Sequence, residues 1–287
     1  MNGPVLVVGA SGNVGGAVVR SLLAAGIPVR AAGTDVTALA RRYPGVQAAR
    51  LDLHDPATFA PALSGVGGLF LLRPPQISRV GPTLNALLDV AERGGVDHVV
   101  FSSVTGAETN RVVPHHRVET HLQASGLSCT ILRPGFFAQN LADAYRTDIL
   151  EDDRIFLPAG SGRAAFIDTR DIGDVAAVVF ADPGAHRGAG YTLTGGQALD
   201  FHEVAAIMTR ELDRPIRYEA ATVLGYLSHL RRQGLPLPLV VVQTILHTGL
   251  RRGQGETVDP TLARLLGRAP RTLAQYVHDH RSTWSTS

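Results

Sequence analysis

The stretch Pro4-Val-Leu-Val-Val-Gly-Ala-Ser-Gly-Asn-Val-Gly-Gly-Ala-Val-Val19 decides the fold of this chain. The apolar run at residues 5–8 predicts a buried strand. The spacing of Val14, Val18 and Leu22 predicts an amphipathic helix directly after it. A strand, a glycine-rich turn and a helix in this order are typical of a site that binds the pyrophosphate of a dinucleotide.

Each glycine of this turn has a physical role in such a site. Gly9 permits the tight turn out of the strand, and Gly12 lets the backbone approach a pyrophosphate. Gly15 allows the helix to pack closely on the sheet. The spacing is G-x-x-G-x-x-G and differs from the G-x-G-x-x-G of most dehydrogenases. Glycines also mark plain turns, but the strand before them and the helix after them favour cofactor binding.

The composition is that of a globular protein. The chain has 287 residues, of which 45% are hydrophobic and 18% charged, enough for one large domain or a domain with a smaller lobe. The formal net charge is only +2 and the arginines are scattered along the chain. These values do not favour nucleic acid as a partner.

The single cysteine and the apolar segments indicate in which compartment the protein is located. Cys129 excludes an intrachain disulfide and lies in an apolar run, which predicts a buried side chain. The N-terminus has no basic region or long apolar stretch typical of a signal peptide. The most apolar segment, residues 235–242, is short and interrupted by prolines, so no membrane span and no membrane partner are expected. We therefore expect a cytoplasmic protein.

Strands and helices alternate through the first half of the chain. This pattern predicts an α/β fold, a doubly wound parallel Rossmann-type sheet with helices on both faces. The rim at the carboxyl ends of its strands should hold the ligand. The predicted strands cover residues 5–8, 28–32, 46–53, 68–72, 96–103 and 129–132, and the helices 39–42, 59–63, 80–93 and 118–124. The predicted rim comprises residues 9–15, 33–35, 52–53, 72–75, 102–105 and 133–137.

The regular alternation ends near residue 141. We predict a dinucleotide-binding domain at residues 1–140 and a smaller α+β C-terminal substrate lobe at residues 141–287, integrated with the first rather than linked flexibly. The lobe is predicted to contain helices at residues 171–180, 201–212, 223–231 and 239–250, with short strands at 191–193 and 216–218.

With the rim segments identified, the chain resembles the NmrA-like family of atypical short-chain dehydrogenases/reductases. The resemblance covers most of the chain, and its stretches follow the family order. They are Gly9-Ala-Ser-Gly-Asn-Val-Gly15, Leu51-Asp-Leu53, Phe70-Leu-Leu-Arg-Pro-Pro75, His98-Val-Val-Phe-Ser-Ser-Val104, Ser125-Gly-Leu-Ser-Cys-Thr-Ile-Leu-Arg-Pro-Gly-Phe-Phe137 with Asn140, and Phe166-Ile-Asp-Thr-Arg-Asp-Ile172.

The resemblance implies an NAD(P)-binding protein and leaves its reaction open. The family contains NAD(P)H-dependent reductases of quinones, azo compounds and ketones, and members that bind the cofactor as redox sensors without turnover. The first hypothesis is hydride transfer to a quinone, enone or ketone, with a flat apolar carbonyl compound or quinone as substrate. The alternatives are a regulatory sensor, and a redox-neutral isomerase or cyclase on the same fold. A homo-oligomer is possible.

The resemblance also implies which residues hold the cofactor. Asp52 and Ser103 have plain alternatives, since either could merely satisfy backbone groups where a strand ends. The implied set is Gly9, Ser11, Gly12, Asn13, Val14 and Gly15 at the pyrophosphate, Asp52 and Leu53 beside the adenine, and Ser103, Val104, Pro134, Gly135 and Phe136 at the nicotinamide, completed by Thr34, Leu72, Arg73 and His115.

The choice between NADP(H) and NAD(H) depends on the end of the second strand. Many relatives have there an Arg that binds the 2′-phosphate of NADP, whereas this chain has Thr34. Asp35 could bind the ribose hydroxyls of NAD, but a cap on the next helix is the favoured interpretation. Arg41 or Arg42 could reach a phosphate or lie on a solvated helix face. The resemblance slightly favours NADP(H).

The catalytic residue is not the usual one, because the chain has no Tyr-x-x-x-Lys motif. Where NmrA-like relatives often have the lysine, this chain has His115. It could take over the positional role of that lysine, or act as proton donor, which its ordinary pKa of about 6.5 suits. His115 and His116 could instead belong to the start of a helix. Thr105 could bind a substrate carbonyl or serve a turn. The 11 histidines are dispersed, so no metal site is expected.

Overall fold

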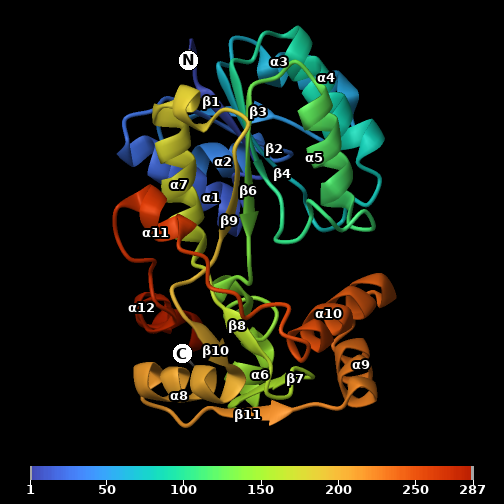
Figure 1. The fold of residues 1–287 in the computed structure, drawn as a ribbon, viewed down its shortest axis with the longest axis vertical. Helices are drawn as coiled ribbons and strands as arrows, with labels where there is room; N and C mark the ends of the chain where they lie inside the picture. Colours follow the sequence, from blue (N-terminus) through green and yellow to red (C-terminus); the bar gives the residue numbers. More distant parts are fainter. Residues whose placement is uncertain (1, 286–287) are drawn as a thin grey trace. The chain divides into compact units, whose positions relative to one another are not determined.

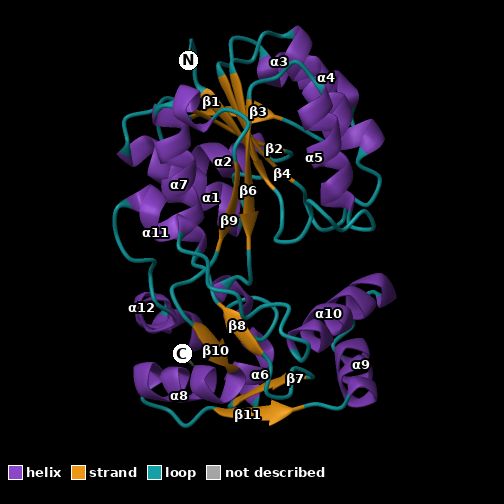
Figure 2. Ribbon diagram, in the orientation of Figure 1, coloured by secondary structure: helices purple, strands orange, loops and turns teal. Residues whose placement is uncertain are grey.

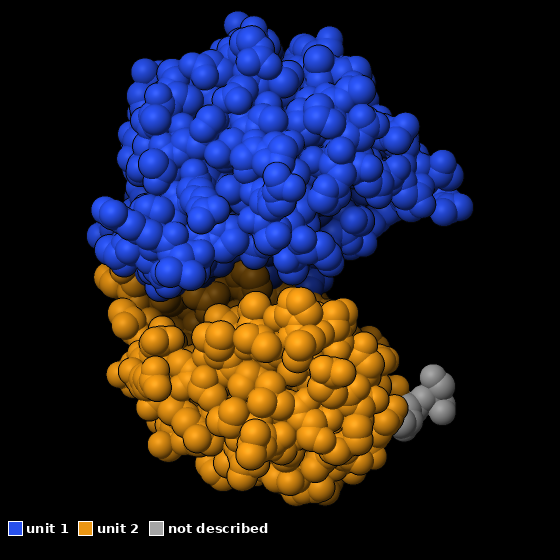
Figure 3. Space-filling model, turned by 90° about the vertical axis from the view of Figure 1, so that its right-hand side faces the viewer, with its two compact units in different colours: residues 1–134, 169–193, 264–267 blue, residues 135–168, 194–263, 268–287 orange. Residues whose placement is uncertain are grey.

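The computed structural model describes residues 2–285 and divides into two compact units. Unit 1 comprises residues 1–134, 169–193 and 264–267, and unit 2 comprises residues 135–168, 194–263 and 268–287 (Figure 3). Each unit has its own hydrophobic core. Among the described residues, no helix combines the length and the apolar character needed to cross a lipid bilayer.

Unit 1 is built on a parallel sheet of seven strands in the spatial order β3-β2-β1-β4-β5-β6-β9 (Figure 2). Helices cover both of its faces (Figure 1). These two features confirm the predicted doubly wound Rossmann-type fold. The strands are β1 (Val5–Val8), β2 (Val29–Gly33), β3 (Gln47–Arg50), β4 (Gly68–Leu72), β5 (His98–Ser102), β6 (Cys129–Pro134) and β9 (Gly190–Leu193).

The strand order reverses beside β1. The chain runs from β1 to β2 and β3 on one side and then crosses to β4, β5 and β6 on the other. In an open parallel sheet, a reversal of this kind makes the loops at the carboxyl ends of the two strands diverge. This is the place where open parallel sheets bind ligands.

Successive side chains of a strand point to opposite faces, and in β1 and β4 the residues of both faces are almost all buried. Leu6 and Val8 of β1, with Leu69 and Leu71 of β4, belong to one core with residues of α3 (Phe59–Leu63), α4 (Ala86–Arg93) and α5 (Pro114–Ala124). Val7, between the first two, is also fully buried. The helices of unit 1 are α1 (Asn13–Ala24), α2 (Val36–Arg42), α3 (Phe59–Leu63), α4 (Ala86–Arg93) with a π turn before it (Gly81–Asn85), α5 (Pro114–Ala124) and α7 (Thr169–Ala181).

Unit 2 has an aromatic core enclosed by helices and two short two-stranded sheets. Phe166, Phe201, Tyr226 and Tyr276 belong to this core, and the Trp284 indole donates to the Leu141 carbonyl at 3.1 Å. The pairs are parallel β7 (Arg154–Leu157) with β11 (Arg217–Ala220), and antiparallel β8 (Arg163–Ala165) with β10 (Ala198–Asp200). The helices are α6 (Arg146–Glu151), α8 (Phe201–Leu212), α9 (Val223–Arg232), α10 (Leu237–Leu250) and α12 (Leu273–Asp279); α11 (Thr261–Leu266) begins in unit 2 and ends in unit 1.

Two sequence predictions are corrected by these elements. A single boundary after residue 140 does not describe the division, because residues 169–193 belong to unit 1. They form α7, which packs on α1, and β9, which pairs with β6 as the seventh strand. The helix predicted at residues 118–124 begins at Pro114, so His115 and His116 lie in its first turn. That the two parts form one integrated body stays a prediction.

Candidate cofactor site

The loop at residues 9–15 follows β1 at the point where the strand order reverses. Gly9 has a φ of +69°, which side chains of L-residues rarely adopt. A Cβ on Gly15 would lie 2.2 Å from the Gly9 carbonyl oxygen, so only glycine fits at this position. The Gly12 N–H donates to the same carbonyl at 2.9 Å and closes the turn. The predicted roles of Gly9 and Gly15 therefore have a steric basis.

Helix α1 presents its N-terminus directly after this loop. Its N-cap, Gly12, has no side chain to bind the first N–H groups, and its first turn contains no acidic residue. Ser11, Gly12 and Asn13 are exposed, and Val14 is half-buried. Because the helix dipole places partial positive charge here, this end of α1 is suited to hold the pyrophosphate of a dinucleotide.

The end of β4 lies beside the glycine loop. A Cβ on Gly9 would lie 3.0 Å from a methyl group of Leu72, so the glycine loop and β4 are in direct contact. Leu72 and Arg73 are half-buried. The structure thus brings together two of the predicted rim segments.

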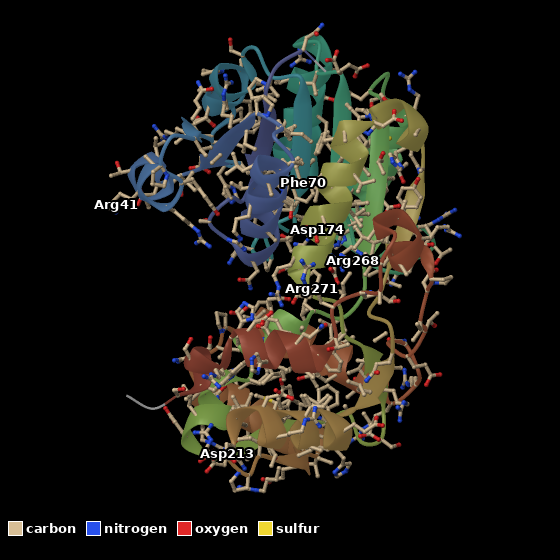
Figure 4. The ribbon with its side chains drawn as sticks, turned by 90° about the vertical axis from the view of Figure 1, so that its left-hand side faces the viewer. Arg41, Phe70, Asp174, Asp213, Arg268 and Arg271 are labelled. Atoms are coloured by element: carbon tan, nitrogen blue, oxygen red, sulfur yellow. The ribbon has the colours of Figure 1, made fainter. Side chains whose placement is uncertain are left out.

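Arg42, at the end of α2, also contacts the glycine loop. Its guanidinium donates to the Ser11 carbonyl at 2.8 Å and lies 5.7 Å from the centre of the Tyr43 ring. The Tyr43 hydroxyl donates to the Ala10 carbonyl at 2.8 Å. Arg41 is exposed on the outer side of α2 (Figure 4). Of the two arginines that the sequence left open, Arg42 is the one at the loop.

The residues after β2 have different roles. Asp35 is the N-cap of α2, since its Oδ1 accepts the Ala38 N–H at 2.9 Å. This confirms the favoured interpretation of Asp35 as a cap. Thr34, which precedes it, is exposed.

Asp52 lies just beyond β3, half-buried in a tight turn. Its Oδ1 accepts the His54 N–H at 2.9 Å, and its backbone N–H donates to the Thr58 hydroxyl at 3.1 Å. Asp52 therefore stabilises the turn that follows β3. Leu53 beside it is buried. Contact of these two residues with adenine stays a prediction.

A buried ion pair lies beneath the ends of β5 and β6. The Ser103 hydroxyl donates to Glu119 Oε1 at 2.5 Å, and the Arg133 Nη2 donates to Glu119 Oε2 at 2.7 Å. Glu119 is only 2% exposed. Arg133 also pairs with Glu108 at 3.2 Å. The hydrogen bond to Glu119 raises the pKa of Arg133, so the guanidinium remains charged.

Thr105 serves the turn after β5. Its hydroxyl donates to the Arg133 carbonyl at 3.2 Å, and its N–H donates to the Pro134 carbonyl at 3.1 Å. These bonds connect the loops that follow β5 and β6. They support the turn interpretation of Thr105, while a bond from Thr105 to a substrate carbonyl stays a prediction.

His115 lies in the first turn of α5 and binds Arg73. The Arg73 Nε–H donates to His115 Nε2 at 3.3 Å, and Arg73 Nη1 donates to the Ile77 carbonyl at 2.6 Å. The imidazole is buried, and its centre lies 6.3 Å from the centre of the Phe101 ring. The contact joins two residues that the sequence assigned to the cofactor site from separate stretches.

Burial and the neighbouring Arg73 charge lower the pKa of His115 to about 4. The histidine is therefore neutral at neutral pH, and its Nε2 is occupied as an acceptor. This pKa lies below the ordinary value of about 6.5, and a role of His115 as proton donor stays a prediction. A positional role for His115 agrees with this geometry.

Gly135 and Phe136 lie just beyond β6, at the start of unit 2. The Phe136 ring packs edge-on against Phe166 at 5.3 Å and also contacts Phe201 and His247. Phe136 thus borders the core of unit 2. Its predicted contact with the nicotinamide stays a prediction.

The sequence did not identify Glu119 or the Arg73–His115 contact. One signal was available, because His115 and Glu119 are four residues apart and face the same side of α5. The residue types alone did not reveal that this side faces Ser103 and Arg73. Among residues 2–285, no group of three or more His, Cys, Asp or Glu side chains forms a potential metal site.

A hollow of about 500 Å³ in unit 1 lies away from this rim. It is lined by residues at the amino ends of β5 and β6, including Asp97, Ser128 and Cys129. Cys129 is buried, which confirms the prediction from the sequence, and burial raises the pKa of its thiol.

The sequence and the fold of this chain are similar to those of known proteins. Residues 1–277 match the model of the NmrA-like family. The chain is 34% identical over 289 residues to an NAD(P)H azoreductase of Xenophilus azovorans, covering 99% of this chain and 100% of the relative. The crystal structure of the NADPH-dependent quinone oxidoreductase QOR2 of Escherichia coli, complexed with NADPH, has a TM-score of 0.85 and 26% identity over 96% of this chain and 99% of that one. The negative transcriptional regulator NmrA in complex with NAD shares the fold, with a TM-score of 0.74 and 18% identity over 98% of this chain and 96% of that one.

Proposed function

Because this chain belongs to the NmrA-like family, we propose that it is an NADPH-dependent reductase of quinones or of similar flat, apolar electron acceptors. The observation that carries the proposal is the full-length similarity to two proteins named as NAD(P)H-dependent reductases, the azoreductase and QOR2. The site geometry supports it, since the glycine loop lies at the carboxyl end of β1, where such sheets bind ligands.

The residues at this end of the sheet fit a nicotinamide dinucleotide. The N–H groups that begin α1 would hold the pyrophosphate, and Gly15 allows the loop to lie close to the helix. Bound NADPH supplies the hydride, so the protein mainly binds and orients the reactants.

Arg42 supports the preference for NADPH. Its guanidinium lies at the Ser11 carbonyl, and Asp35, the acid that could bind the ribose hydroxyls of NAD, caps α2. A charged guanidinium beside the loop attracts a phosphate, and planar Arg–phosphate pairs are among the strong charge-assisted bonds. We propose that Arg42 rotates from the Ser11 carbonyl to the 2′-phosphate.

The proton that accompanies the hydride need not come from a side chain. The Ser103 hydroxyl is committed to Glu119, and His115 is neutral and accepts from Arg73. Hydride addition to a quinone produces a hydroquinone anion, which takes its proton from water. We propose that Ser103, Glu119 and Arg133 fix the ends of β5 and β6, and that His115 holds Arg73 beside β4.

A second candidate is a sensor that binds the cofactor without turnover. The specific observation in its favour is the missing Tyr-x-x-x-Lys, since a sensor needs no catalytic acid. The full-length similarity to two reductases favours the enzyme.

The test is the oxidation of NADPH and NADH, in parallel, with quinones, enones, ketones and azo dyes. We expect saturable turnover with quinones or azo dyes and a lower KM for NADPH than for NADH. Tight cofactor binding without turnover of any acceptor would instead establish the sensor. Equal KM values for the two cofactors would remove the proposed role of Arg42.

A further inference from the structure

Helix α10 of unit 2 exposes one continuous apolar face. Val242, Ile245 and Leu246 are 51%, 63% and 58% exposed. With Leu237 and Val241, they lie within half of the helix circumference, because positions three and four apart share a face. Isolated exposed apolar residues are ordinary, but a contiguous apolar helix face marks an interaction surface.

The opposite face of α10 is packed in the unit 2 core, so the helix is firmly placed. Val240 and His247 are buried, and Val240 and Leu250 belong to the aromatic core. The Tyr226 hydroxyl of α9 donates to the Gln243 side chain at 3.3 Å. Because the buried face is packed in the core of unit 2, the exposed apolar face is available to contact a partner.

The charged side chains of residues 220–255, which include α9 and α10, are all basic. Residues 220–255 contain no Asp or Glu, although the whole chain has 25. The same segment has two arginine pairs, Arg231 with Arg232 at the end of α9 and Arg251 with Arg252 after α10. All four are exposed, and in the described part of the chain no ion pair joins them to a carboxylate. The apolar face is thus flanked at both ends by positive charge.

We propose that the α9–α10 hairpin docks on an anionic lipid membrane surface, with α10 lying in the plane of the interface. Val241, Val242, Ile245 and Leu246 enter the boundary between headgroups and acyl chains. The two arginine pairs contact lipid phosphates on either side. Helix α10 has 14 residues and is about 21 Å long, so it lies on the membrane and does not cross it.

A second copy of the chain is a poorer occupant of this face. In a symmetric dimer each copy would present the same patch, so the arginine pairs of both would gather at one interface. Residues 220–255 offer no carboxylate to neutralise them. An anionic membrane supplies both the apolar layer and the negative charge. The sequence prediction of no membrane partner rested on spanning segments and did not consider surface attachment.

The test is co-flotation of the full chain with vesicles of phosphatidylcholine alone or of phosphatidylcholine mixed with phosphatidylglycerol. We expect binding only to vesicles that contain phosphatidylglycerol. Binding should weaken in about 1 M NaCl, where the screening length falls to about 3 Å. The measurement requires no turnover, so its result does not depend on whether the protein has the proposed reductase activity.

Two variant pairs separate the apolar and the charged contributions. Val242→Gln with Ile245→Gln should lower the vesicle partition coefficient on the order of tenfold, because two buried side chains are lost. Arg231→Gln with Arg252→Gln should lower it about fivefold for each arginine. The matched controls are Leu23→Gln and Arg20→Gln, exposed residues of α1 in unit 1, which should leave it unchanged.

Three outcomes would overturn the proposal. The first is no binding to anionic vesicles, and the second is equal loss of binding in the control variants. The third is a dimer that Val242→Gln with Ile245→Gln converts to monomer, without any vesicle binding by the wild type. Sedimentation equilibrium of the same samples reports this, and thermal unfolding verifies that every variant is folded.

Discussion

Arg42 is the charged side chain that contacts the glycine loop, and its substitution tests cofactor preference at the scale of a single residue. We expect Arg42→Gln to raise the KM for NADPH at least about tenfold, since a charge-assisted bond to phosphate contributes about 1.5–3 kcal/mol. The KM for NADH should change little, because NADH lacks the 2′-phosphate. Initial-rate kinetics with both cofactors measure the two values.

Arg41→Gln is the matched control, one residue away and exposed on the outer side of α2. It should leave both KM values near those of the wild type. Equal losses for NADPH and NADH in Arg42→Gln would show that the residue supports the loop and does not select the phosphate.

The pH dependence of turnover tests the role of His115. Because its pKa is lowered to about 4, the imidazole stays neutral between about pH 5 and pH 8. His115→Gln should therefore lower kcat by a moderate factor, through loss of the Arg73 contact, without changing the shape of the pH–rate profile. An ionisation near pH 6.5 in the wild type that disappears in His115→Gln would instead make His115 the proton donor.

Residue patterns predicted the part of the site that the backbone forms. The glycine loop follows from steric rules that act within a few residues, such as the 2.2 Å clash that a Cβ on Gly15 would produce. The contacts of Ser103 with Glu119 and of Arg73 with His115 span 16 and 42 residues. Such pairs depend on how helices pack on the sheet, which spacing along the chain does not specify.

At the scale of elements, the close contact of α7 with α1 is set by Gly173. A Cβ there would lie 2.7 Å from the Ala17 carbonyl oxygen. The next residue of α7, Asp174 (labelled in Figure 4), accepts a hydrogen bond from the Ser21 hydroxyl of α1 at 2.7 Å. We expect Gly173→Ala to force the helices apart and destabilise the protein by about 1–3 kcal/mol. Urea unfolding measures this difference.

Gly81→Ala is the control for this substitution, since nothing lies within 4 Å of the Cβ that it adds. It should change the free energy of unfolding by less than about 0.5 kcal/mol. A neutral Gly173→Ala would mean that α7 shifts on α1 without loss of packing.

The elements themselves were predicted best where the chain alternates regularly. Strand β4 and helices α3 and α8 have the predicted bounds, because each has a clear apolar period and definite ends. Residues 190–193 were placed in the lobe, whereas β9 completes the main sheet. A short strand carries no signal for which sheet it joins, since pairing with β6 is a tertiary contact.

At the scale of the whole molecule, neither unit is one continuous segment. The chain leaves unit 1 after residue 134, returns at 169–193, and returns again at 264–267. A fragment that ends at residue 140 would lack α7 and β9, leaving β6 as an unpaired edge and the α1 surface uncovered. We expect this fragment to aggregate or remain unfolded, as judged by circular dichroism and gel filtration, whereas a folded, NADPH-binding fragment would contradict the interleaved division.

The free energy of unfolding should decrease at acidic pH, because three histidines, two in unit 1 and one in unit 2, are buried in neutral form. Burial is the main cause that lowers the pKa of His98 and His115 in unit 1 and of His247 in unit 2 to about 4 each. In the unfolded chain each has a pKa of about 6.5 and binds protons that the folded chain excludes. Stability is therefore retained above pH 6.5 and lost as the pH falls toward 4, by about 2 kcal/mol for each histidine between pH 7 and pH 5.

Thermal unfolding at pH 7 and pH 5 measures this loss. His98→Gln removes a titrating group that bonds Ser128 and Thr130, so it should be less stable at pH 7 but lose less stability on acidification. The exposed His54 provides the control, since His54→Gln should retain the full wild-type loss. If His98→Gln and His54→Gln lose the same stability between the two pH values, His98 does not titrate on unfolding, and the acid sensitivity must then come from His115, His247 or the carboxylates.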